Sequence, residues 1–279
     1  MFPLKYGDFS RPVAGINSEK YNLFYRAAVL SSYNTMISTL RDLIRRTNPC
    51  GRETQTASAY DDWSESYDHQ PGNLVLDMEE SIFSRLLEAL DLRGAVVIDF
   101  GCGTGRHWPK IYEKNPGFLM GFDLSDGMLA RLKEKFPRAT VVRTKNLLPP
   151  EIASGCAGCL ISTLTLAHIP RYAETIASWA RVMKPGADLI LTDFHPDMLK
   201  KGATRSFTHQ QRTRTITSHI RAIGTLCRIF KDHGFELLRK EERIVDENAK
   251  PYYEAKDALN LYEKFRGYPL VFGLHLKKI

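Results

Sequence analysis

The most informative segment of the chain is a short apolar run that leads directly into a turn with three glycines. Ala95–Phe100 reads AVVIDF, and Gly101–Gly105 follows it as GCGTG. A run of this length predicts a strand buried on both faces, which is typical of a parallel sheet. Glycine lets the backbone adopt positive φ and lets a ligand approach without a Cβ in its way. Because ligands of open α/β sheets bind at the carboxyl ends of the strands, this turn predicts a binding crevice.

The same pattern recurs along the chain and predicts alternating strands and helices. An apolar run over Phe118–Phe122 ends at Asp123, and Ser125 is placed to cap the following helix. Further strands are expected near residues 140–143, 159–163 and 188–192, with helix-like segments between them. This alternation predicts an α/β fold, a Rossmann-like, doubly wound, mostly parallel sheet of seven strands.

The two ends of the chain depart from this rhythm. Residues 235–244 and 270–276 read as strands without a crossover helix after the second, so a C-terminal antiparallel hairpin is expected. Ser18–Arg46 has apolar residues at spacings of three and four, which predicts a helix. We therefore expect a helical N-terminal extension with a polar linker over residues 1–58 and an α/β domain over residues 59–279. The extension is a candidate surface for a homodimer, a cover for the active site, or an addition to the core.

The spacing of the glycines distinguishes two kinds of nucleotide ligand. A dinucleotide site requires GxGxxG, whereas this turn reads GxGxG and has Arg106 where the third glycine would fall. The pattern therefore argues against an NAD-dependent dehydrogenase. Asp99 suits a ligand with a positive amino group and sulfonium, and Asp123 can accept hydrogen bonds from both hydroxyls of a ribose. An adenosine joined through sulfur to an amino acid fits both carboxylates.

In these residues the chain resembles class I S-adenosylmethionine-dependent methyltransferases of the ubiquinone-biosynthesis-like branch. DFGCGTG at 99–105 and GFDLSDGML at 121–129 resemble motifs I and II of that family. Residues 60–68 resemble its opening segment, 160–170 its fourth-strand motif, and 182–193 its KPG turn and fifth strand. The last strand also matches, so the resemblance covers residues 59–279.

The resemblance implies S-adenosylmethionine as the methyl donor and a set of residues that hold it. The implied residues are Asp99, Gly101, Gly103 and Gly105 for the methionine part, Asp123 for the ribose, Leu124 and Met128 beside the adenine, Thr163 and Leu164 near the methyl group, and Tyr60 or Tyr67 above the donor. The family often has an acid in the next loop that contacts the adenine amino group. This chain has none there, and Thr144 or Asn146 is the expected acceptor of that hydrogen bond.

The methyl acceptor is expected to be a small molecule, with oxygen slightly favoured over nitrogen or carbon because candidate histidine bases are available. The predicted catalytic residues are His195, which follows the fifth strand, and His219, which opens the helix after the next insertion. His168 is expected to pack locally. Insertions at 197–218 and 245–268 are expected at the acceptor site. The first either recognises an anionic or aromatic acceptor or forms a solvated lid, and its candidate contacts are Arg205, Phe207, His209, Arg212 and Arg214.

Composition limits the other functions. The net charge of +7 is scattered, with a modest concentration over 200–221, so nucleic acid is not the expected partner. RNA or protein methylation and a non-catalytic donor-binding module remain alternatives. Five cysteines and one isolated CxxC, Cys156–Cys159, predict reduced thiols and no metal site. Without an apolar run of 18 residues or a signal-like N-terminus, the expected location is the cytoplasm, with no membrane partner.

Overall fold

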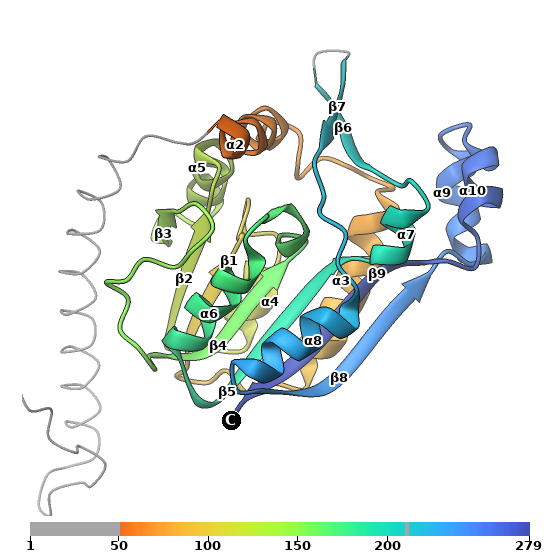
Figure 1. Cartoon of the computed structure of the whole chain (residues 1–279). Coiled ribbons are helices and arrows are strands. Elements are labelled where there is room, and N and C mark those ends of the chain that lie inside the picture. The colour runs from red at the N-terminus through yellow and green to blue at the C-terminus, as the bar shows by residue number, and fades with distance from the viewer. Residues whose placement is uncertain (1–50, 210–211) are drawn as a thin grey trace, which may run out of the picture. The chain divides into compact units, whose positions relative to one another are not determined.

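The computed structural model describes residues 51–209 and 212–279, and Figure 1 shows a twisted sheet with helices packed around it. In this part of the chain the main sheet has the strand order β3-β2-β1-β4-β5-β9-β8. Its strands are β1 (Val96–Phe100), β2 (Phe118–Asp123), β3 (Thr140–Arg143), β4 (Ala157–Thr163), β5 (Met183–Phe194), β8 (Phe235–Ile244) and β9 (Pro269–Lys278). Strand β9 runs antiparallel to β5 and β8, and the other pairs are parallel. The predicted seven-stranded α/β fold and its C-terminal hairpin are confirmed.

Helices cover both faces of this sheet. Helix α3 packs against β5, β8 and β9, whereas α6 and α8 pack together on the opposite face, in front of the sheet in Figure 1. The helices are α2 (Gly51–Ser64), α3 (Leu74–Glu88), α4 (Trp108–Glu113), α5 (Asp126–Lys135), α6 (Tyr172–Val182), α7 (Pro196–Lys200), α8 (Ile223–Asp232), α9 (Lys250–Glu254) and α10 (Leu259–Phe265), with short 3₁₀ turns η1 (Leu166–His168) and η2 (Glu247–Ala249). The central strands β1, β2 and β4 are therefore buried on both faces and almost entirely apolar. The edge strand β8 is instead largely exposed and rich in charged residues.

Local sequence accounts for where the two helices beside the sheet begin. Asn73 caps α3, because its side-chain oxygen accepts a hydrogen bond from Leu76 N at 3.3 Å. Ser125 caps α5 in the same way, with Met128 N donating to Oγ at 3.0 Å, as the sequence predicted. Such a cap typically contributes about 1 kcal/mol to stability. The inner face of α3 then buries Ile82, Phe83, Leu86 and Leu87 in the core.

Four parts of the chain differ from expectation or lie outside what the structure describes. Residues 51–58, expected as a linker, are the first part of α2, and Ala57 is buried although no apolar period precedes it. The insertion at 197–218 contains α7 and a separate hairpin of β6 (Arg205–His209) and β7 (Arg212–Ile216). The insertion at 245–268 contains η2, α9 and α10. The predicted helix over 18–46 lies outside the described residues.

The start of α8 also differs from the prediction. The helix begins at Ile223, and the residues before it are held by the loop after β4. His219 N donates to Ala167 O at 2.7 Å, and Arg221 Nη1 donates to Leu166 O at 3.1 Å. These bonds hold the backbone around His219 against the loop after β4, so this residue precedes the helix and does not open it.

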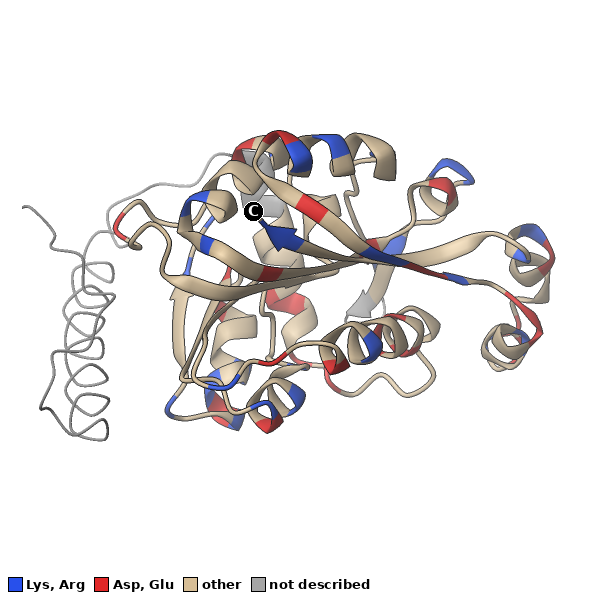
Figure 2. Ribbon diagram, turned by 90° about the horizontal axis from the view of Figure 1, so that it is seen from below, with Lys and Arg blue, Asp and Glu red and all other residues tan. Residues whose placement is uncertain are grey.

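The charge distribution and the lengths of the helices bear on possible partners. Figure 2 shows Lys and Arg interspersed with Asp and Glu over the drawn helices, and β8 carries both signs as well. Among the described residues, no helix is both long enough and apolar enough to cross a bilayer.

Candidate active site

A cavity of about 380 Å³ lies where the carboxyl ends of β1, β2 and β4 meet α2 and the β6–β7 hairpin. This volume is within the range of small-molecule sites, about 300 to 1,000 Å³. Most residues that the sequence assigned to a donor or catalytic role line it: Tyr60, Tyr67, Gly101, Gly103, Asp123, Leu124, Met128, Thr144, Asn146, Thr163, Leu164 and His219. Three predicted residues, Asp99, Gly105 and His195, do not.

The glycine turn forms one wall of this cavity because its backbone is left-handed. Gly101 and Gly103 have φ values of 78° and 51°. A Cβ at Gly101 would stand 2.0 Å from Thr165 Oγ1, so only glycine fits under the loop after β4. A Cβ at Gly103 would meet no protein atom within 4 Å. The space beside Gly103 is therefore open to a ligand, which is the arrangement that a nucleoside donor requires.

Asp123 joins the glycine turn to the next helix. Its Oδ2 accepts a hydrogen bond from Gly103 N at 2.8 Å, and its Oδ1 accepts one from Ser125 N at 2.9 Å. Burial raises the pKa of Asp123, and these backbone donors act in the opposite direction. Each carboxylate oxygen has further acceptor capacity. The carboxylate is thus held at the cavity wall and can accept hydrogen bonds from ribose hydroxyls, so these residues fit S-adenosylmethionine.

Asp99 and Gly105 were predicted to contact the methionine part of the donor, and the structure places both outside the cavity lining. Successive side chains of a strand point to opposite faces, and it is Phe100 that lines the cavity. The Asp99 Oδ2 accepts a hydrogen bond from Trp108 Nε1 at 2.8 Å. Burial raises the pKa of Asp99 to about 6, against the effect of this bond. Asp99 therefore anchors α4 behind the turn.

The segment that starts in α2 is fastened over the donor motifs. Asp61 Oδ1 accepts hydrogen bonds from Ser125 Oγ at 2.5 Å and from Gly127 N at 2.9 Å, so it caps α5 from outside. Asp68 accepts a hydrogen bond from Thr104 Oγ1 at 2.6 Å, inside the glycine turn. These bonds place the two predicted tyrosines, Tyr60 and Tyr67, at the cavity.

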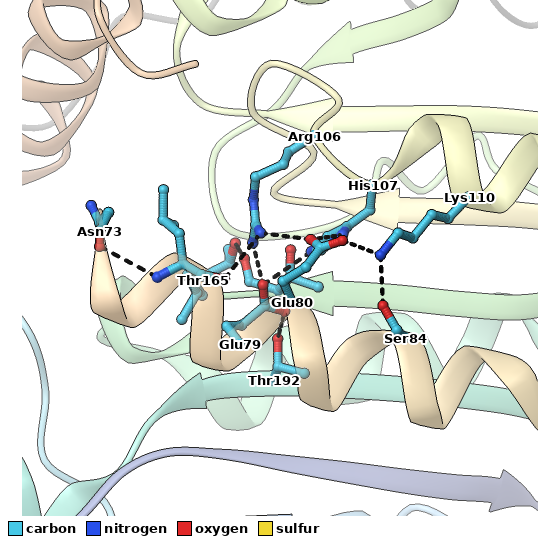
Figure 3. Close-up of polar contacts among 12 residues, drawn as sticks. Asn73, Glu79, Glu80, Ser84, Arg106, His107, Lys110, Thr165 and Thr192 are labelled. Atoms are coloured by element: carbon cyan, nitrogen blue, oxygen red, sulfur yellow. Dashed lines mark hydrogen bonds and ion pairs between the residues drawn. The ribbon is translucent and has the colours of Figure 1, made fainter. Parts of the chain in front are cut away.

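A buried ionic network supports the glycine turn from α3, and Figure 3 shows its members. Glu79 is fully buried; it accepts hydrogen bonds from Thr192 Oγ1 at 2.6 Å and from His107 Nε2 at 3.1 Å, and it pairs with Arg106. Burial alone would raise the pKa of Glu79, but the charges of His107 and Arg106 hold it well below its usual value. Arg106 also pairs with Glu80 at 3.0 Å. The network ties the residues that follow the turn to α3.

The same cluster has the composition of a metal site. Ligand atoms of Glu79, Glu80 and His107 lie within 4.8 Å of one another. However, Arg106 pairs with both carboxylates, and Lys110 pairs with Glu80. These cations already balance the carboxylates, so the cluster is explained as an ionic anchor.

The loop after β4 forms the wall nearest the predicted methyl position. Leu164 has a φ of 50°, which is unusual for a residue with a branched side chain and is characteristic of functional sites. Its backbone is bonded on both sides, with N donating to Thr192 O at 2.8 Å and O accepting from Arg205 Nη1 at 3.0 Å. Arg205 lines the cavity as well. The strained residue is thus stabilised from β5 and from the hairpin.

His168 is a cavity residue that sequence reasoning assigned to local packing. Its Nδ1 must donate to the Thr217 carbonyl at 2.8 Å, which leaves the lone pair on Nε2. This Nε2 is buried and has no hydrogen-bond partner among the described residues. Burial, and then the charge of Arg205, lower the pKa of His168 to about 3, so the ring is neutral. The sequence signal that could have placed His168 in the cavity is that it lies only four residues after Leu164, which was assigned to the methyl position.

His195 was predicted to be catalytic, and the structure places it outside the cavity lining. Its Nδ1 accepts a hydrogen bond from Asp197 N at 3.2 Å and caps α7, while Nε2 lies 3.1 Å from Glu242 Oε1 of β8. The ring packs edge-on against Phe272. Both nitrogens are engaged in the fold, and no atom of His195 lines the cavity.

The two predicted acceptor insertions make unequal contributions. Arg205 and residues 215–217 of the first insertion line the cavity. Phe207 instead stacks on Trp63 with a centroid distance of 4.7 Å, and Arg214 pairs with Asp62 at 2.9 Å, so both dock the hairpin onto α2. The side chains of His209 and Arg212 lie outside the described residues. No residue of 245–268 lines the cavity, and Tyr262 is buried in the hydrophobic core.

The strand order, the glycine turn after β1 and the acid at the end of β2 together define an S-adenosylmethionine-dependent methyltransferase. The chain belongs to a methyltransferase domain family, whose model matches residues 75–240, more than half of its length. An uncharacterized methyltransferase of Emericella nidulans is 27% identical over 222 residues, which cover 66% of this chain and 77% of the relative. The malonyl-[acyl-carrier protein] O-methyltransferase of Xylella fastidiosa is 29% identical over 142 residues, which cover 46% of this chain and 45% of the relative.

Solved structures share the fold at low sequence identity. An S-adenosylmethionine-dependent methyltransferase from Mesorhizobium loti superposes with a TM-score of 0.54 at 19% identity, over 70% of this chain and 97% of its own. The [4+2]-cyclase SpnF gives a TM-score of 0.62 at 16% identity, over 82% of this chain and 98% of its own. The fold is therefore shared by a methyltransferase and a cyclase.

Proposed function

We propose that the protein transfers a methyl group from S-adenosylmethionine to a small-molecule acceptor, with oxygen as the favoured acceptor atom. The observation that carries this proposal is that one cavity joins the donor motifs to the β6–β7 hairpin. Gly103 and Asp123 lie in its wall together with Arg205, Ile216 and His219. A cavity of about 380 Å³ suits a donor with a small acceptor better than it suits a folded macromolecule.

The donor would lie along the carboxyl ends of the strands. Its methionine part would lie over Gly101 and Gly103, its ribose at Asp123, and its adenine against Leu124 and Met128. When bound, S-adenosylmethionine would supply the methyl group of its sulfonium. An acceptor atom would attack the methyl carbon in line, and S-adenosylhomocysteine would leave with the electrons of the broken carbon–sulfur bond, so much of the catalysis is positioning. The chain contributes by fixing the donor with bonded backbone and by enclosing the acceptor beneath the hairpin.

Two histidines at the acceptor side support an oxygen acceptor. His219 lines the cavity and its backbone is fixed on Ala167 O, so we propose it as the residue that removes the acceptor proton. His168 stays neutral and its Nε2 can accept a hydrogen bond from the acceptor. The O-methyltransferase activity in the name of the Xylella fastidiosa relative also supports oxygen.

The experiment is a screen for turnover with S-adenosylmethionine and a panel of phenols, carboxylic acids and amines, with bulk RNA and a denatured protein mixture as further arms. Formation of S-adenosylhomocysteine and the mass of the product are measured. We expect a methylated small molecule, and we expect His219→Ala to lower kcat while the affinity for S-adenosylhomocysteine stays unchanged. His69→Ala is the matched control, because His69 is exposed and outside the cavity lining.

Three results would contradict the proposal. Methylation of RNA or protein alone would favour a macromolecular methyltransferase. Tight donor binding without turnover on any arm would favour a donor-binding module. A fully active His219→Ala variant would remove that residue as the base.

A further inference from the structure

One cation of the cavity has no counter-ion in the described part of the chain. Arg205 begins β6, lines the cavity and is only 5% exposed. Its Nη1 donates to Leu164 O at 3.0 Å, and its Nη2 lies 3.5 Å from Tyr67 Oη. A guanidinium has five N–H donors, and these two neutral oxygens are its only hydrogen-bond partners among residues 51–209 and 212–279. The charge of Arg205 is therefore buried without an ion pair to a described carboxylate.

Arg106, which directly follows the glycine turn, has carboxylate partners, in contrast to Arg205. Arg106 is paired with Glu79 and Glu80, as Figure 3 shows. The acid whose charge acts on Arg205 is Asp193 at the end of β5, but it forms no ion pair with Arg205. Its Oδ2 accepts from Ala167 N at 2.6 Å and its Oδ1 accepts from Phe194 N at 2.8 Å. Asp193 is thus oriented toward backbone donors.

Aromatic rings fix the guanidinium in place. Its carbon lies 5.2 Å from the ring centre of Trp63, 5.8 Å from that of Phe194 and 5.9 Å from that of Tyr60. These rings exclude water and hold the planar group in one orientation. A buried charge in such surroundings is unfavourable unless an opposite charge joins it. No carboxylate among residues 51–209 and 212–279 forms an ion pair with Arg205, and a ligand that enters the cavity can supply one.

We propose that Arg205 binds an anionic group of the methyl acceptor, a carboxylate or a phosphate, so that the acceptor is an anionic small molecule. This inference rests on the proposed function. The planar fork of arginine matches the two oxygens of such a group. Arg205 comes from the hairpin insertion, not from the donor motifs, and it is bonded to Leu164 beside the predicted methyl position. We therefore assign it to the acceptor and not to the carboxylate of the donor.

The test measures binding by calorimetry with the full-length protein. Benzoate and its neutral counterpart benzamide are titrated with and without saturating S-adenosylhomocysteine, and S-adenosylhomocysteine and 5′-methylthioadenosine are titrated separately. The variants are Arg205→Met, which keeps length without charge, and Arg205→Lys, which keeps charge without the fork. Arg214→Met is the matched control, because Arg214 lies on the same hairpin but outside the cavity lining. Melting temperatures establish that each variant is folded.

We expect the wild-type protein to bind benzoate at least about tenfold more tightly than benzamide, as one charge-assisted bidentate contact allows. Arg205→Met should abolish that preference, Arg205→Lys should reduce it, and Arg214→Met should retain it. The affinity for S-adenosylhomocysteine should change by less than about threefold in all variants. Absence of a benzoate preference in the wild type would overturn the proposal.

A second result would overturn it in another way. If Arg205→Met weakens S-adenosylhomocysteine strongly but leaves 5′-methylthioadenosine unchanged, the guanidinium binds the carboxylate of the donor. Failure of the wild type to bind S-adenosylhomocysteine would instead contradict the donor site of the proposed function. Because benzoate is also titrated without that ligand, the two failures are distinguishable.

Discussion

Replacing Glu79 by glutamine tests the ionic network that supports the glycine turn. The change removes one charge and keeps the shape of the side chain. Glu79 is fully buried, and the substitution deprives His107 and Arg106 of a carboxylate at once. Breaking a buried ion pair typically costs about 3 to 5 kcal/mol. Arg106 retains Glu80 at 3.0 Å and its side chain is 22% exposed, so we take the lower end, about 3 kcal/mol.

The free energy of unfolding is measured by urea denaturation followed by tryptophan fluorescence, and the melting temperature by circular dichroism. For a domain of this size, a loss of about 3 kcal/mol corresponds to a decrease of about 6 to 12 °C in the melting temperature. Glu254→Gln is the matched control. Its carboxylate pairs with Lys250 at 3.7 Å on an exposed helix, so the expected loss is about 0.5 kcal/mol or less. If Glu79→Gln is no less stable than this control, the network does not anchor the turn as argued.

Three further predictions concern the turn, the acid limb of stability and the hairpin. Gly101→Ala should destabilise the protein by about 2 to 4 kcal/mol in urea denaturation, because it adds left-handed strain and a Cβ 2.0 Å from Thr165 Oγ1. The Cβ of Gly103→Ala would meet no protein atom within 4 Å, so this variant should lose donor affinity with a smaller loss of stability. The hydrogen bond with His107, together with Lys110 and against the effect of burial, lowers the pKa of Glu80 to about 2. Its contribution to the free energy of unfolding is therefore complete above the unfolded pKa of about 4.3 and is lost as the pH falls toward 2. When unfolding is compared at several pH values, Glu80→Gln should lack this part of the decrease in stability at low pH. Phe207→Ala removes the stacking on Trp63 and should weaken docking of the hairpin by about 2 kcal/mol. We expect faster amide exchange in β6 and β7 with unchanged exchange in β1 and β4. Exchange rates in β6 and β7 equal to those of the wild type would contradict this prediction.

Local patterns were sufficient to predict the sheet. The strands over Phe235–Ile244 and Thr140–Arg143 have the bounds that the sequence indicated. Helix α2 was missed because its first turns have no apolar period, and it is held by bonds from Asp61 to Ser125, 64 positions along the chain. Such long-range contacts leave no local signal.

In the site, too, some residues could be placed from local sequence and others are placed by long-range contacts. The glycine turn and Asp123 could be placed from motif spacing alone. His195 lies at the carboxyl end of β5, as expected, but the direction of its ring is set by Glu242, 47 positions later. Arg205 and His168 are brought to one cavity by the hairpin and the loop after β4. In the described part of the chain, Arg205 has no ion pair and His168 Nε2 has no hydrogen-bond partner. These are properties of the packed structure, which no single segment reveals.

The most direct test of the central claim is calorimetric titration of ligand-free protein with S-adenosylhomocysteine, for the wild type and for Asp123→Ala. We expect binding in the micromolar range by the wild type and a loss of at least about tenfold in the variant, because the carboxylate that would hold the ribose is gone. No binding by the wild type, or equal binding by the variant, would contradict the donor site described around Gly103 and Asp123.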